Sequence, residues 1–127
     1  MITLITGATS GIGEQLAKLY AQAGDTVIAC GRNQEKLNEL AQLTNIESCQ
    51  FDATDLQAIR SSTVAYTQFD RVILNAGNCE YIDDAHNFDS ALFTRVVTTN
   101  LLFISFAIAI VTQLLFIMIY SLRSSFK

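Results

Sequence analysis

Residues 6–13 read Thr-Gly-Ala-Thr-Ser-Gly-Ile-Gly and hold three of the six glycines of the chain. The stretch lies between a short apolar run at residues 2–6 and a helical pattern that extends from residue 11 to about residue 23. A helix that begins directly after such a loop presents bare main-chain N–H groups, and its dipole adds partial positive charge at that end. The spacing and its context therefore predict a loop that cradles a diphosphate.

Each glycine of this loop has a separate expected role. Gly7 permits the turn out of the strand, Gly11 lets the backbone approach a phosphate, and Gly13 lets the helix pack close to the strand. A P-loop would need Gly-Lys-Ser/Thr and a nucleophile elbow would need Gly-x-Ser-x-Gly, whereas Glu14 and Gln15 follow Gly13 here. A glycine-rich turn that binds nothing stays open as the alternative.

The rest of the chain alternates short apolar runs with helical patterns. Strands are expected at residues 2–6, 26–30, 46–51 and 71–75, and helices from residues 11, 34, 55 and 90. Asn33 and a Thr54–Gln57 capping box mark two of the helix starts. This order predicts an α/β fold, a partial Rossmann domain whose doubly wound parallel sheet has strand order 3-2-1-4, with residues 116–120 as the candidate fifth strand. The first helix is expected to present one apolar face, made of Ile12, Leu16, Leu19, Tyr20 and Ala23.

The chain has 127 residues, of which 50% are hydrophobic and 16% are charged, with a net charge of −4. This length fits one domain with its own core, and the composition excludes intrinsic disorder. The acidic balance argues against nucleic acid as a partner. The cysteines at positions 30, 49 and 79 make no disulfide framework, and residues 1–7 lack the features of a signal peptide, so the cytoplasm is the expected location.

The residues at the end of the second expected strand indicate which dinucleotide is bound. An acid at this point favours NAD, whereas an arginine accommodates the 2′-phosphate of NADP. The sequence reads Cys30-Gly31-Arg32-Asn33 without an acid, so Arg32 is a candidate NADP selector, with NAD as the alternative cofactor. A surface arginine without a ligand is the competing interpretation, although a cation near a helix start is mildly unfavourable.

Further motifs follow in order along the chain: Asp52 before Ala53-Thr54-Asp55, then Asn75-Ala76-Gly77, then Asp89 and Phe93 ahead of Asn100-Leu101. Together with the glycine loop and Gly31-Arg32, they resemble the short-chain dehydrogenase/reductase family over residues 2–101. The resemblance implies hydride transfer between NADP(H) and an alcohol or carbonyl substrate. It also implies a cofactor site made of Gly7, Ser10, Gly11, Ile12, Gly13, Arg32, Asp52, Asn75, Ala76 and Gly77.

The family's proton-transfer pair, Tyr-x-x-x-Lys, is absent, because none of the four tyrosines has a lysine four residues later. Asn100 alone matches the family's catalytic group, as its structural asparagine, since Ser121 lies several residues too close to Asn100 to match the family serine. We therefore expect residues 1–127 to form a single incomplete, truncated domain that binds a nicotinamide dinucleotide. Without an acid or base it is expected to be inactive alone.

Residues 101–122 form an apolar tail, and no charged residue lies between Val96 and Leu122. Twenty such residues in a helix match the thickness of a bilayer. A buried helix or an interface between copies of the chain is favoured over a membrane span, because Thr112 and Gln113 would lie in the middle of the bilayer. A reading frame that shifted or stopped early is a third interpretation of the tail. The runner-up function is accordingly a non-enzymatic nucleotide-binding module that is tethered to a membrane or docked to a partner. The polar residues of the 77–89 loop match no metal-ligand spacing, so no metal site is expected.

Overall fold

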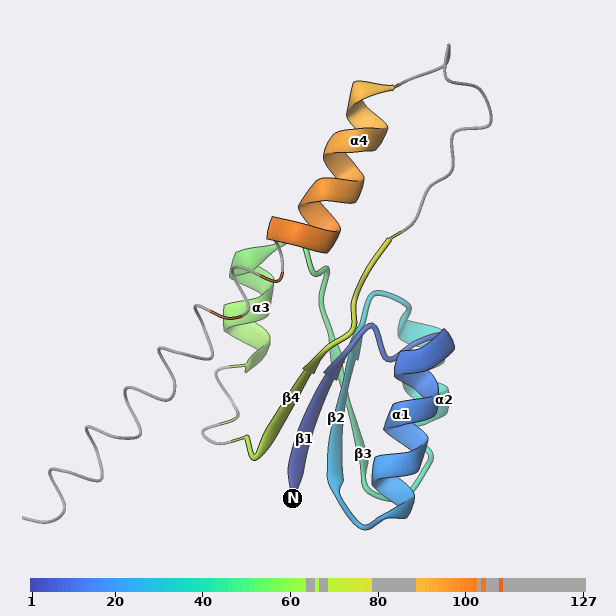
Figure 1. Ribbon diagram of the computed structural model, residues 1–127. Coiled ribbons are helices and arrows are strands. Elements are labelled where there is room, and N and C mark those ends of the chain that lie inside the picture. The colour runs from blue at the N-terminus through green and yellow to red at the C-terminus, as the bar shows by residue number, and fades with distance from the viewer. Residues whose placement is uncertain (64–65, 67–68, 79–88, 103, 105–107, 109–127) are drawn as a thin grey trace, which may run out of the picture.

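The computed structural model describes residues 1–63, 66, 69–78, 89–102, 104 and 108. Its strands are all parallel and form one sheet in the order β3-β2-β1-β4, as the sequence predicts (Figure 1). The strands are β1 (Ile2–Thr6), β2 (Thr26–Gly31), β3 (Ile46–Gln50) and β4 (Arg71–Leu74). The helices are α1 (Gly11–Gln22), α2 (Gln34–Leu40), α3 (Leu56–Thr63) and α4 (Ser90–Val97), and a π-helical turn, η2 (Thr98–Leu102), continues α4.

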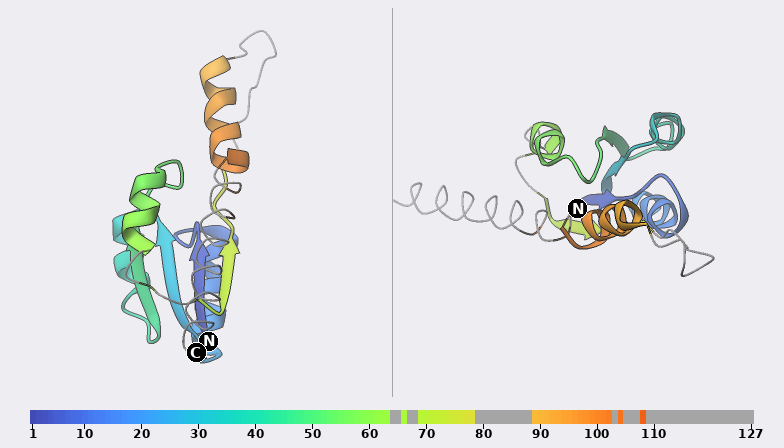
Figure 2. Two further views of the ribbon diagram at one scale, coloured as in Figure 1. Left: turned by 90° about the vertical axis from the view of Figure 1, so that its left-hand side faces the viewer. Right: turned by 90° about the horizontal axis from the view of Figure 1, so that it is seen from above.

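Helices cover both faces of the sheet (Figure 2). α1 and α2 pack on one face, where Ile5 and Val27 belong to a buried cluster. α3 packs on the other face, where Ile59 shares a second cluster with Leu4 and Ile28. Neighbouring residues of a strand point to opposite faces, so coverage on both sides explains why β1 and β2 are buried along almost their whole length. The doubly wound arrangement predicted from the sequence is thus confirmed.

The apolar face predicted for α1 is confirmed only in part: Leu16 and Tyr20 pack against the buried cluster on this side of the sheet. Ile12 and Leu19, which the apolar pattern places on the buried face, are 73% and 60% exposed. The buried residues are instead Gly13, Ala17 and Ala21, which lie four residues apart along one side of the helix. Their small side chains let the α1 backbone approach the sheet closely, and this requirement outweighs the burial of larger residues on the neighbouring stripe.

Side chains fix the starts of α2 and α3. Asn33 caps α2 as predicted, since its side-chain oxygen accepts a hydrogen bond from a main-chain N–H of the first turn at 3.1 Å. The predicted capping box at α3 is wrong, because Asp55 rather than Thr54 caps this helix. Asp55 Oδ1 accepts from two main-chain N–H groups at 2.9 and 3.0 Å, while the Thr54 hydroxyl donates to Asp52 at 2.7 Å. A carboxylate that accepts two hydrogen bonds is the stronger cap.

α4 begins at Ser90, as predicted, and rises beyond the carboxyl edge of the sheet (Figure 1). It buries none of its residues, and Phe93 is 55% exposed. Most of the apolar tail, including the candidate fifth strand at residues 116–120, lies outside the described residues. Among the helices of the described residues, none combines the length and the apolar character needed to cross a membrane.

Candidate functional site

Seven of the eleven predicted site residues line an open groove of about 170 Å³ at the carboxyl edge of the sheet, whereas the other four are not among its lining residues. The strand order reverses here, between β1 and β4, and ligands of open α/β sheets bind at such switch points. Gly11, Ile12 and Gly13 form the start of α1, and Asn100 lies in η2. The predicted residues that line the groove are Gly7, Ser10, Arg32, Asp52, Asn75, Ala76 and Gly77.

The glycine loop has the backbone that its composition predicts. Gly7 and Gly11 have φ angles of 65° and 55°, in the left-handed region that favours glycine. A Cβ on Gly7 would lie 2.8 Å from Ala76 Cα, and a Cβ on Gly13 would overlap the carbonyl oxygen of Gly7. A Cβ on Gly11 would meet nothing within 4 Å. Gly7 and Gly13 therefore allow close packing, while Gly11 keeps the main chain open to a ligand.

The start of α1 is arranged for an anion. Ser10 occupies the N-cap position, but its side chain makes no capping hydrogen bond, so it does not occupy the first-turn N–H groups. Glu14 is an acid in this first turn, and its Oε1 accepts a hydrogen bond from Lys18 Nζ, one turn further along the helix, at 2.6 Å. The hydrogen bond and charge of Lys18 lower the pKa of Glu14. The negative charge nearest the helix start is thereby paired, which favours a phosphate at this end.

Thr6 joins the glycine loop to the loop that follows β4. The Thr6 hydroxyl accepts hydrogen bonds from the main-chain N–H groups of Asn75 (3.0 Å) and Ala76 (3.1 Å). Asn75 Nδ2 in turn donates to the carbonyl oxygen of Gly7 at 3.3 Å. These N–H groups lie just past the last β1–β4 pair, Thr6 and Leu74, so the hydroxyl takes the place of a ladder partner. Sequence reasoning missed this role, since the partners are 69 and 70 residues away.

Asn100 holds the same loop from η2. Its Nδ2 donates to the carbonyl oxygen of Asn78, and its Oδ1 accepts from the N–H of Asn78, each at 2.6 Å. A Cβ on Gly77 would lie 3.2 Å from Oδ1, so glycine at this position leaves room for the bridge. The contacts fit the structural asparagine that the resemblance implies, and a part in catalysis stays a prediction.

Arg32 and Asp52 face each other across the groove. Arg32 Nη1 lies 3.9 Å from Asp52 Oδ2, and the Arg32 side chain is 73% exposed. Burial opposes ionisation of Asp52, but its hydrogen bonds from Thr54 and the charge of Arg32 outweigh burial and lower the pKa of its carboxyl. Long, exposed ion pairs contribute little to stability. Arg32 is therefore able to turn toward another anion without breaking a strong contact.

Five lining residues were not predicted, and each adjoins a predicted one in the chain. Thr9 and Gly31 fit together, because a Cβ on Gly31 would lie 2.6 Å from Thr9 Cγ2. Glycine at the end of β2 thus makes room for the side chain of Thr9. Three of the five lie inside the quoted motifs and the other two stand one residue before a motif; the whole set consists of Thr9, Gly31, Phe51, Ala53 and Thr99.

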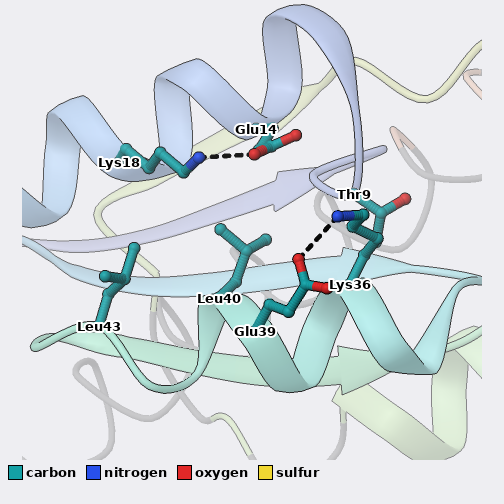
Figure 3. Close-up of a pocket in the computed structure, with 7 residues that line it drawn as sticks. All are labelled: Thr9, Glu14, Lys18, Lys36, Glu39, Leu40 and Leu43. Atoms are coloured by element: carbon teal, nitrogen blue, oxygen red, sulfur yellow. Dashed lines mark hydrogen bonds and ion pairs between the residues drawn. The ribbon is translucent and has the colours of Figure 1, made fainter.

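A second hollow, of about 160 Å³, lies between α1 and α2 (Figure 3). Glu14 pairs with Lys18 on α1 at 2.6 Å, and Lys36 pairs with Glu39 on α2 at 2.7 Å. The hydrogen bond and charge of Glu39 raise the pKa of Lys36. Thr9 borders both this hollow and the groove. Because the charges of the two pairs cancel, this hollow offers no net positive charge to an anionic ligand.

Comparison with known proteins places the chain in a family. The model of the short chain dehydrogenase family matches residues 1–120. NADP-dependent 3-hydroxy acid dehydrogenase YdfG of Shigella flexneri is 34% identical over 106 residues, which cover 79% of this chain and 43% of that protein. Sulfoacetaldehyde reductase 2 of Chromohalobacter salexigens is 33% identical over 108 residues, with the same two shares. The chain thus spans less than half the length of these curated relatives.

Solved structures agree with the sequence matches. The closed form of serine dehydrogenase complexed with NADP+ aligns with a TM-score of 0.83 at 30% identity, over 90% of this chain and 48% of that one. Serine dehydrogenase from Escherichia coli aligns with a TM-score of 0.82 at 31% identity, over 90% and 55% of the two chains. The strand order, the glycine loop and the family match lead to one conclusion: the chain belongs to the short chain dehydrogenase family.

Proposed function

We propose that the groove binds NADP(H) and that residues 1–127 are the cofactor-holding part of a short-chain dehydrogenase/reductase. The observation that carries the proposal is the open backbone at Gly11, which stands at the start of α1 beside the switch point of the sheet. Relatives named as NADP-dependent, and a structural neighbour complexed with NADP+, support the same cofactor.

The residues present fit the parts of this dinucleotide. Main-chain N–H groups at residues 11–13 hold the diphosphate, as helix starts do. Arg32 holds the 2′-phosphate through charge-assisted hydrogen bonds, and Asp52 accepts from the adenine ring. Asn75, Ala76 and Gly77 line the path toward the reacting end of the cofactor. When bound, NADP(H) supplies a hydride donor or acceptor for an alcohol or carbonyl substrate.

Selection of NADP over NAD depends on Arg32. The guanidinium lies 3.9 Å from Asp52 and is mostly exposed, so its position is loosely held. A 2′-phosphate offers Arg32 a closer and more highly charged partner than Asp52 does. NAD lacks that phosphate and leaves Arg32 with Asp52 alone. NAD is therefore expected to bind more weakly than NADP, without being excluded.

Proton transfer is not expected from these residues alone. Reduction of a carbonyl requires a proton at the substrate oxygen, and no Tyr-x-x-x-Lys pair occurs in the 127 residues. Asn100 acts as a positioning residue through its two hydrogen bonds to Asn78. We propose that the chain binds the cofactor without turning over an aldehyde. A longer protein that adds the pair would complete the site.

Fluorescence titration with NADPH and NADH tests the cofactor assignment. Arg32→Glu is expected to weaken NADPH binding about tenfold or more, because a hydrogen bond to a charged group contributes about 1.5–3 kcal/mol. NADH affinity should change little. Arg60→Glu on α3 makes the same charge change away from the groove and serves as the matched control. Equal losses for NADPH and NADH would remove Arg32 from its role. No binding of either dinucleotide to the folded chain would overturn the proposal.

We also propose that a second copy of the chain covers α4. α4 buries none of its residues, and Phe93, Leu101 and Ile108 are each more than half exposed. Exposed apolar side chains in one region are typical of interfaces. Sedimentation velocity should show a dimer that dissociates on Phe93→Glu, and a monomer at every concentration would contradict the proposal.

The membrane-tethered alternative depends on residues outside the described ones, and retention in the membrane fraction after an alkaline wash would support it.

A further inference from the structure

Two cysteines lie opposite each other in the sheet. Cys30 on β2 and Cys49 on β3 are register partners in a parallel pair. Neighbouring strands are about 4.8 Å apart, and disulfides join Cα atoms that are about 4.4–6.8 Å apart. Both side chains belong to the buried cluster beneath α3, so they point to the same face of the sheet. The backbone therefore holds two free thiols at a spacing that a disulfide can bridge.

The two thiols differ in their surroundings. Cys30 is fully buried, and its sulfur lies 3.6 Å from the carbonyl oxygen of Ile28. Cys49 is 7% exposed and lies 3.8 Å from the carbonyl oxygen of Ser62, near the end of α3. β3 is an edge strand among those described, which leaves Cys49 nearer to solvent. A small oxidant therefore reaches Cys49 before Cys30.

The two thiols also differ in pKa. The hydrogen-bonding interaction with Cys30 lowers the pKa of Cys49 to about 7. The same interaction, together with burial, raises the pKa of Cys30 well above its ordinary value. Of the two thiols, Cys49 is therefore the one that ionises first, and the thiolate is the reactive form of cysteine. Geometry and charge single out the same sulfur as the first to react.

We propose that Cys30 and Cys49 form a redox-active thiol pair that hydrogen peroxide converts to a reversible disulfide between β2 and β3. The Cys49 thiolate attacks a peroxide oxygen, the O–O bond breaks, and a sulfenic acid forms as hydroxide leaves and takes up a proton as water. The Cys30 sulfur then attacks the Cys49 sulfur, the S–O bond breaks, and a second water leaves with the thiol proton. Two thiols are oxidised and one peroxide is reduced to two waters.

The parallel register also predicts that this bond is easily reduced. In-register Cβ atoms of a parallel pair are separated by about the strand spacing of 4.8 Å, which exceeds the separation of about 3.8 Å typical of relaxed disulfides. The strands must close slightly to form the bond, and strained disulfides are the labile ones. Arg32 and Asp52 follow the two cysteines in the chain by two and three residues. The pair is thus close in the chain to the residues that the proposed function assigns to the adenosine end of the cofactor.

Mass spectrometry of the full chain tests the proposal. The chain carries Cys79→Ser, which leaves Cys30 and Cys49 as its cysteines. After peroxide treatment in the folded state, the intact mass should fall by two hydrogen atoms and neither thiol should react with iodoacetamide. Peptide mapping should show a Cys30–Cys49 link, and dithiothreitol should restore both thiols. The readout does not depend on nucleotide binding, so its failure is distinct from failure of the proposed function.

Single variants provide the controls. In the same background, Cys30→Ser should stop at the sulfenic acid of Cys49, which dimedone traps, whereas Cys49→Ser should show little reaction. Far-UV circular dichroism confirms that each sample is folded. Two thiols that remain fully alkylatable after peroxide, or a disulfide that forms only between chains, would overturn the proposal. Preferential trapping at Cys30 would overturn the order of the two steps.

Discussion

Replacing Thr6 with valine tests how the two sides of the groove are joined. Valine matches the shape of threonine but removes the hydroxyl that accepts from the N–H groups of Asn75 (3.0 Å) and Ala76 (3.1 Å). A buried donor left without a partner costs about 1–3 kcal/mol. Since both residues are half-buried and water replaces part of each bond, we expect Thr6→Val to lower the free energy of unfolding by about 2 kcal/mol in total.

Urea unfolding followed by circular dichroism measures this difference, and Thr6→Ser is the matched control. Serine keeps the acceptor and loses one buried methyl group, worth about 1 kcal/mol. If the hydrogen bonds matter more, Thr6→Val has a lower free energy of unfolding than Thr6→Ser. If burial of apolar surface alone decided stability, Thr6→Val would be the more stable of the two. Amide hydrogen exchange at Asn75 and Ala76 should also accelerate in Thr6→Val. A Thr6→Val chain as stable as Thr6→Ser, with unchanged exchange, would refute the reasoning.

Two further predictions concern packing and pH. Gly13→Ala places a methyl group against the carbonyl oxygen of Gly7, so α1 must move and the thermal midpoint should fall, for a loss of about 1–3 kcal/mol; an unchanged midpoint would show that α1 is not held closely. Asp25 accepts from the Thr3 hydroxyl at 2.9 Å and pairs with the N-terminal ammonium at 3.4 Å and with Arg71 at 3.1 Å, and these contacts outweigh burial and lower its pKa. The ionised Asp25 carboxylate therefore stabilises the fold fully above the pKa that Asp25 has in the unfolded chain. This stabilisation is lost as the pH falls through the lower pKa that Asp25 has in the folded chain. Urea unfolding between about pH 5 and pH 2 should therefore show a steeper loss of stability for the native chain than for Asp25→Asn, and parallel curves would contradict this.

The fold could be predicted from local signals that agree with one another. The glycine loop marks the end of the first strand, and short apolar strands between helices require a parallel sheet covered on both faces. The strand order 3-2-1-4 predicted from the sequence is confirmed. The predicted face of α1 was right for Leu16 and Tyr20, which pack against the buried cluster, and wrong for Ile12 and Leu19, which are exposed. Hydrophobic patterns rank residues by size, whereas the closest contact of α1 with the sheet selects Gly13, Ala17 and Ala21.

The candidate site could be predicted where its residues belong to contiguous motifs. Seven of the predicted residues line the groove, and each lining residue that was missed is a neighbour in the chain of a predicted site residue. Thr6 shows where sequence reasoning stops, because its hydroxyl acts on main-chain groups about seventy residues away. The N-cap of α3 is a second case that the sequence does not decide, since Thr54 and Asp55 are adjacent and both residue types are good N-caps. Only the geometry shows which of the two accepts the hydrogen bonds.

The binding of the diphosphate at the start of α1 is tested most directly by NMR. Amide chemical shifts of the isotope-labelled chain are followed during titration with NADPH. We expect the largest changes at Gly11, Ile12 and Gly13, followed by changes at Ala76 and Gly77 across the groove. Shifts confined to the hollow between α1 and α2, or no shifts at saturating NADPH, would contradict the account.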